Sequence, residues 1–70
     1  MEEKVLKYED VINKLSGVIA SKVVLDGQEI REIHVLTNRS RAPKQISRDI
    51  QSSLTAYYGM PIDHRMISIA

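Results

Sequence analysis

Cysteine, tryptophan and phenylalanine are absent from this sequence of 70 residues, which has only three glycines and two prolines. Without cysteine the chain has no disulfide and no thiolate metal ligand, the usual supports of very short domains. No apolar run approaches the ~18 residues of a membrane span, and the net charge of +1 excludes a strongly basic nucleic-acid arm. The apolar fraction of 43% is that of a globular domain. We therefore expect one small soluble domain over residues 1–70.

Two segments, residues 3–15 and 42–58, have the periodicity of amphipathic helices. Their apolar residues recur at spacings of three and four, which places them on one helical face. Pro43 suits the first turn of the second helix, and Gly17 and Gly59 suit the left-handed position that follows a helix. The predicted apolar faces consist of Val5, Tyr8, Val11, Ile12 and Leu15 in the first helix and Ile46, Ile50, Leu54 and Tyr57 in the second.

Three segments are predicted to be strands, at residues 18–25, 29–37 and 65–69. The first two are rich in β-branched residues and flank Asp26-Gly27, a strong hairpin signal. A two-residue loop would place Lys22 opposite Arg31, whereas a three-residue loop would place it opposite Glu32. We prefer the three-residue loop because opposite charges across strands are favourable. That register puts Ile19, Val23, Leu25, Ile33 and Val35 on the core face of the sheet.

The order helix–strand–strand–helix–strand predicts an α+β fold, in which both helices pack on one face of a three-stranded sheet. The other face of the sheet is then left uncovered by the chain. A contiguous exposed apolar patch on a small protein marks an interface, so we predict that a protein partner or a second copy docks there. The predicted interface residues are Val18, Ala20, Val24, Ile30, His34 and Leu36.

Residues 38–48 carry four positive charges and no acid. We call Arg39, Arg41, Lys44 and Arg48 the basic cluster. The cluster surrounds the start of the second helix, where backbone N–H groups attract anions. It therefore indicates a site for a phosphate, a carboxylate or an acidic partner segment, although such a cluster is more often an ordinary solvated helix face. Weak, salt-sensitive RNA binding is a further alternative.

No catalytic constellation is visible in the sequence. None of the seven serines lies in a nucleophile elbow, and two histidines, His34 and His64, are too few for a metal site. All tyrosines fall on the predicted helices, which argues against an RNA-binding sheet. We expect no enzyme, no cofactor and no metal. The charged start of the chain is unlike a signal peptide, so we expect a cytoplasmic location.

The element order, the glycine hairpin Val23-Val24-Leu25-Asp26-Gly27 and the glycine before Met66-Ile67-Ser68-Ile69 resemble the BON-type small bacterial domain. Residues 32–36 and 41–50 are also similar to stretches of uncharacterised bacterial modules. The resemblance covers most of the chain and implies a non-catalytic binding or accessory module. It supplies no functional residues.

Overall fold

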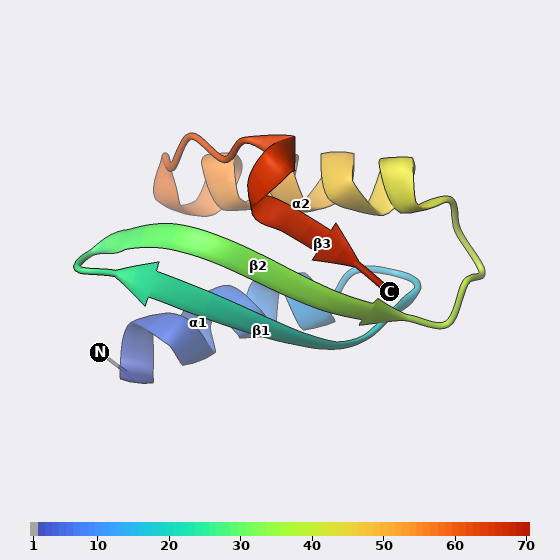
Figure 1. Cartoon of the computed structure of the whole chain (residues 1–70), viewed down its shortest axis with the longest axis horizontal. Coiled ribbons are helices and arrows are strands. Elements are labelled where there is room, and N and C mark those ends of the chain that lie inside the picture. Colours follow the sequence, from blue (N-terminus) through green and yellow to red (C-terminus); the bar gives the residue numbers. More distant parts are fainter. Residues whose placement is uncertain (1) are drawn as a thin grey trace.

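A computed structural model describes residues 2–70 of the chain, and side chains from Val5 onward. Both predicted helices and all three predicted strands are present in the predicted order, which confirms the α+β class. The elements are α1 (Glu2–Asn13), β1 (Val18–Asp26), β2 (Glu29–Thr37), α2 (Pro43–Tyr58), the short 3-10 helix η1 (His64–Met66) and β3 (Ile67–Ile69) (Figure 1).

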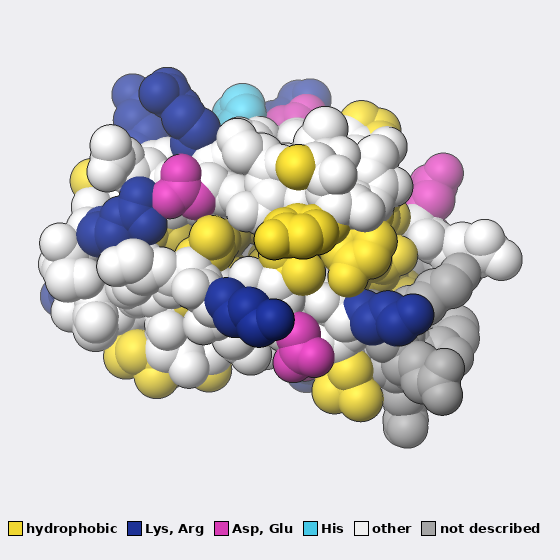
Figure 2. Space-filling model, turned by 180° about the vertical axis from the view of Figure 1, so that it is seen from behind, with side chains coloured by type: hydrophobic (Ala, Val, Ile, Leu, Met, Phe, Trp, Pro, Cys, Tyr) yellow, Lys and Arg dark blue, Asp and Glu magenta, His cyan; other side chains and the backbone are white. Residues whose placement is uncertain are grey.

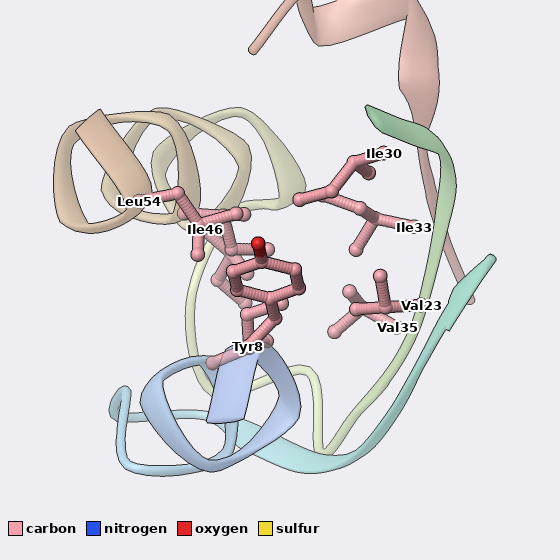
Figure 3. Close-up of a cluster of buried hydrophobic side chains, with 9 residues drawn as sticks. Tyr8, Val23, Ile30, Ile33, Val35, Ile46 and Leu54 are labelled. Carbon is pink, nitrogen blue, oxygen red and sulfur yellow. The ribbon is translucent and has the colours of Figure 1, made fainter. Parts of the chain in front are cut away.

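The sheet has β2 in its centre. β1 pairs with β2 in the antiparallel direction, and β3 pairs with the other side of β2 in the parallel direction. One hydrophobic core joins α1, α2, β1 and β2, so both helices cover the same face of the sheet, as predicted (Figure 3). The buried core consists of Tyr8, Ile12, Val23, Ile30, Ile33, Val35, Ile46, Ile50 and Leu54.

The ends of α2 agree closely with the sequence, whereas α1 ends at Asn13, two residues before the predicted end, and Gly17 lies in the turn between α1 and β1. Ala42 precedes α2 as a cap without a side-chain hydrogen bond, and Pro43 follows it in the first turn. Gly17 and Gly59 take the predicted left-handed conformation, with φ of 92° and 65°. The prediction for Tyr57 is wrong because its side chain is 72% exposed.

The neighbouring Tyr58 takes the place predicted for Tyr57 at the end of α2. Its ring meets that of Tyr8 edge-on, with the ring centroids 5.0 Å apart. Tyr58 follows Leu54 at a spacing of four, so it continues the row that the buried residues of α2 begin. Tyr58 thus extends the apolar row of α2 with a side chain that is 39% exposed and contacts the core through the ring of Tyr8.

The predicted hairpin register is wrong. Asp26 pairs with Glu29, so the loop holds only Gly27 and Gln28, and Lys22 lies opposite His34 instead of Glu32. A bulge follows in β2, because Leu25 pairs with Ile30 whereas Val24 pairs with Glu32.

The bulge leaves Arg31 unpaired and turns Ile30 and Ile33 to the same side. Both are buried, Ile30 with 5% exposure. Burying one isoleucine contributes about 1.5–3 kcal/mol, whereas a cross-strand charge pair contributes at most about 1 kcal/mol. Burial therefore decides the register, and Ile30 belongs to the core instead of the predicted interface.

A second irregularity lies at the start of β1. Val18 pairs with Thr37 and Ala20 pairs with Leu36, which leaves Ile19 without a partner on β2. Ile19 is 59% exposed, whereas Val18 packs against the core. The two predictions are thus reversed: Ile19 leaves the core face, and Val18 leaves the predicted interface.

The last strand is shorter than predicted. Residues 64–66 form η1 instead of strand, and β3 begins at Ile67. Asp63 caps η1 by accepting a hydrogen bond from the backbone N–H of Arg65 at 2.9 Å. This local polar contact stabilises a turn at positions where the alternation of apolar side chains predicts extended backbone.

Candidate functional site

The face of the sheet that points away from both helices is the first candidate surface, and we call it the outer face. Side chains alternate between the two sides of a strand, and Val23, Ile33 and Val35 point into the core. Their neighbours along each strand therefore point outward. The outer face consists of Ala20, Lys22 and Val24 from β1, Glu32, His34 and Leu36 from β2, and Ser68 from β3.

Four of the six predicted interface residues lie on the outer face: Ala20, Val24, His34 and Leu36. The face is more polar than predicted because Val18 and Ile30 leave it, whereas Lys22 and Glu32, which the predicted register also places there, remain. Glu32 Oε1 lies 3.6 Å from His34 Nε2, and both side chains are about half exposed.

A shallow hollow of about 360 Å³ crosses the three strands on the outer face. Leu36 is 50% exposed at this hollow, so it gives the face an apolar centre flanked by charges of both signs. The hollow is lined by Ala20, Ser21, Lys22, His34, Val35, Leu36, Ser68, Ile69 and Ala70.

Within the basic cluster, Arg41 differs from the other three residues because it contacts other parts of the chain. Arg41 forms an ion pair with Asp49, and its Nη1 donates a hydrogen bond to the Ser16 carbonyl at 3.1 Å. Arg41 therefore joins α2 to the turn between α1 and β1. The other members, Arg39, Lys44 and Arg48, are exposed. From behind, Lys and Arg side chains are seen to gather toward the end of the molecule where α2 begins (Figure 2).

Two further hollows follow the free side of β3 and share Pro43 and Ile69 as lining residues. We call them together the β3-edge groove. The first, of about 540 Å³, is lined by Thr37, Arg39, Ser40, Arg41, Ala42, Pro43, Ile69 and Ala70. The second, of about 510 Å³, is lined by Pro43, Lys44, Ser47, Arg48, Gln51, His64, Ile67 and Ile69. The structure thus brings the whole basic cluster to one groove, although the sequence did not predict that β3 forms its other wall.

The turn before β3 holds a compact charged group. The Asp63 carboxylate accepts hydrogen bonds from the Arg65 side chain, the shortest from Nη2 at 2.8 Å, and lies 3.3 Å from His64 Nδ1. The side-chain hydrogen bond from Arg65, with its backbone hydrogen bond, lowers the pKa of Asp63 from 3.8 to about 2. The same contact raises the pKa of Arg65. The sequence analysis did not identify this charged group, in which Arg65 is the main partner of Asp63.

A fourth hollow, with a volume of about 720 Å³, lies beside this turn. It is lined by Gln51, Thr55, Pro61, Ile62, Asp63, His64 and Arg65.

Among the side chains of residues 5–70, no three His, Cys, Asp or Glu are grouped so that they could hold a metal ion. Within residues 2–70, no helix is long and apolar enough to cross a membrane.

Sequence reasoning also missed the contacts that close the free side of β1. Glu9 Oε2 of α1 accepts a hydrogen bond from the backbone N–H of Val23 at 2.9 Å. One turn further along α1, Asn13 Oδ1 accepts a hydrogen bond from the Ser21 hydroxyl at 2.7 Å. In the sequence, these contacts are indicated only by the spacing of four between Glu9 and Asn13, which places both polar side chains on one flank of α1.

The fold and its surfaces define a small α+β domain with two helices on one face of a mixed sheet. No protein-family model matches the sequence, so the resemblance to BON domains is not confirmed, and no curated protein sequence matches it. Among solved structures, the chain is similar to the type III secretion system protein EscJ of enteropathogenic E. coli. The match has a TM-score of 0.58 at 19% identity, and it covers 99% of this chain and 44% of that chain. The likeness shows a shared fold over less than half of the secretion protein.

Proposed function

We propose that this chain is a protein-interaction module without a catalytic role, which associates with a second copy through its outer face. The observation that carries the proposal is the one-sided packing of the domain. Both helices contribute to the core on one side of the sheet, and the other side is left open. Leu36 lies half exposed there, beside a hollow of about 360 Å³.

The charges of the outer face favour a second copy as its occupant. Lys22 lies on β1 and Glu32 on β2, so a single face carries both signs. In a two-fold arrangement each surface meets its own copy, and Lys22 of one copy can approach Glu32 of the other at two symmetric positions. The shared fold with a component of a secretion system supports a role in protein assembly.

The size of the outer face sets the expected strength of association. The nine-residue strands β1 and β2 are each about 30 Å long, the three-residue strand β3 is about 10 Å long, and neighbouring strands lie about 4.8 Å apart. The resulting area is about 340 Å² per copy, less than half of the ~800 Å² per partner in a standard stable interface. We therefore expect a weak, reversible dimer instead of a permanent one.

Sedimentation equilibrium between about 10 µM and 1 mM tests this proposal. We expect the mean mass to rise with concentration in the wild-type chain and to stay at the monomer value in Leu36→Lys. The matched control is Leu6→Lys, because Leu6 of α1 is 58% exposed but lies on no strand. A wild-type chain that stays monomeric over this range contradicts the proposal, as does a Leu36→Lys variant that associates like the wild type.

A further inference from the structure

The two edge strands of the sheet, β1 and β3, differ in whether other parts of the chain cover their outer edges. The edge of β1 is closed by α1, through the hydrogen bonds of Glu9 to Val23 and of Asn13 to Ser21. Side chains that cover an edge strand prevent another strand from adding to it. Among the described side chains, those of residues 5–70, none forms such a hydrogen bond with the outer edge of β3.

The backbone of β3 offers hydrogen-bonding groups to this open edge. The Ala70 N–H donates to the Val35 carbonyl at 2.8 Å, and the Ala70 carbonyl accepts from the Thr37 N–H at 2.9 Å. Both groups of Ala70 thus point toward β2, and backbone groups alternate in direction along a strand. Those of Ile67 and Ile69 therefore point to the open edge. The Ile67 N–H donates a hydrogen bond to the His64 carbonyl. The N–H and carbonyl of Ile69 and the carbonyl of Ile67 can therefore pair with an added strand.

Helix α2 already provides the layer beneath an additional strand. Two helices side by side are about 20 Å wide, whereas three strands span only about 14 Å. Figure 1 shows β3 between β2 and α2, with α2 extending past the edge of β3. Lys44, Arg48 and Gln51 of this flank line the β3-edge groove together with Ile67 and Ile69. A strand that pairs with Ile69 would lie over this flank.

The positive charge of the β3-edge groove favours an added strand with acidic side chains. Arg39, Lys44 and Arg48 are exposed along it, and none of its lining residues is acidic. Side chains of an added strand that point toward α2 would meet these cations. We propose that the β3-edge groove binds a short acidic segment of a partner protein, which adds to β3 as a fourth strand with Asp or Glu at alternate positions.

The experiment is an NMR titration of the full chain with the capped peptide acetyl-Glu-Val-Glu-Val-Glu-amide at low ionic strength. We expect saturable shifts of the amides of residues 39–48 and 67–70, and a large downfield shift for Ile69 as its N–H gains an acceptor. The double variant Lys44→Glu/Arg48→Glu should bind about tenfold more weakly or worse. The control Lys7→Glu/Lys14→Glu, which reverses one charge on α1 and one in the turn directly after it, should bind like the wild type.

Methylated peptides separate strand addition from charge attraction alone. One peptide is methylated at its Glu nitrogens and another at its Val nitrogens, so that each carries methyl groups along one strand edge without a change of side chain. One of the two should no longer shift Ile69, because methyl groups on the edge that faces β3 remove its donors and prevent its carbonyl groups from approaching the Ile69 N–H. Wild-type-like binding of both methylated peptides overturns the proposal. It is also overturned if inorganic phosphate or a short oligouridylate produces the same shifts at lower concentration, or if the peptide shifts only outer-face residues. This test does not depend on self-association, since the Leu36→Lys variant keeps the β3-edge groove and should bind the peptide unchanged.

Discussion

At the scale of single residues, Asp63 has the most strongly displaced acid–base equilibrium identified in residues 2–70. Its carboxylate accepts hydrogen bonds from both the backbone N–H and the guanidinium of Arg65, in the turn that leads to β3. The folded-state pKa of about 2 lies below the ordinary value of 3.8. Since the pKa is depressed, the contact stabilises the turn at pH values above 3.8, and this stabilisation is lost as the pH falls through about 2.

We expect the Arg65→Ala substitution to raise the pKa of Asp63 toward 3.8, because it removes the guanidinium hydrogen bond, the largest cause of the lowering, while the backbone hydrogen bond at position 65 remains. Carboxyl carbon shifts measured by NMR across the acid range give the pKa of both proteins directly. His64→Ala is the matched control and should leave the pKa of Asp63 nearly unchanged, because the charge of His64 is the weakest of its causes. A wild-type Asp63 that titrates near 3.8 contradicts this account of the turn.

At the scale of elements, the bulge in β2 decides which side chains form the core. The strand carries Ile30 and Leu36 at an even spacing, so strict alternation places both on one face. The unpaired Arg31 breaks that alternation and leaves Ile30 buried and Leu36 exposed. The adjacent charged residues Arg31 and Glu32, both exposed, are the sequence signal of the bulge. The buried faces of the helices were predicted more accurately than those of the strands because the apolar spacing of the helices is not interrupted by a bulge.

We expect Ile30→Ala to lower the free energy of unfolding by about 2–5 kcal/mol, because it opens a cavity in the core. Leu36→Ala should change it by about 0.5 kcal/mol or less, since that side chain is half exposed. Urea denaturation at a concentration where the chain is monomeric measures both values. Equal losses in the two variants would mean that β2 runs without its bulge.

At the scale of the whole molecule, the sequence predicts that one sheet face is uncovered, because two amphipathic helices suffice for only one side. It does not predict the position of β3, since strand order depends on contacts between residues far apart in the chain. The outer face was therefore anticipated in four of its residues, whereas the β3-edge groove emerges only when Ile69 is placed beside Pro43. The basic cluster has a recognisable sequence pattern, but its pairing of Arg41 with Asp49 requires the folded loop.

The central claim, that the domain associates through its outer face, is tested most directly by recording amide NMR spectra of the wild-type chain during dilution from about 1 mM to 10 µM. We expect concentration-dependent shifts for Ala20, Lys22, His34, Leu36 and Ser68, which all lie on that face. Amides on the exposed side of α1, such as those of Lys7 and Asp10, should not move. Spectra that do not change with concentration, or changes confined to the helices and to the β3-edge groove, would contradict the claim.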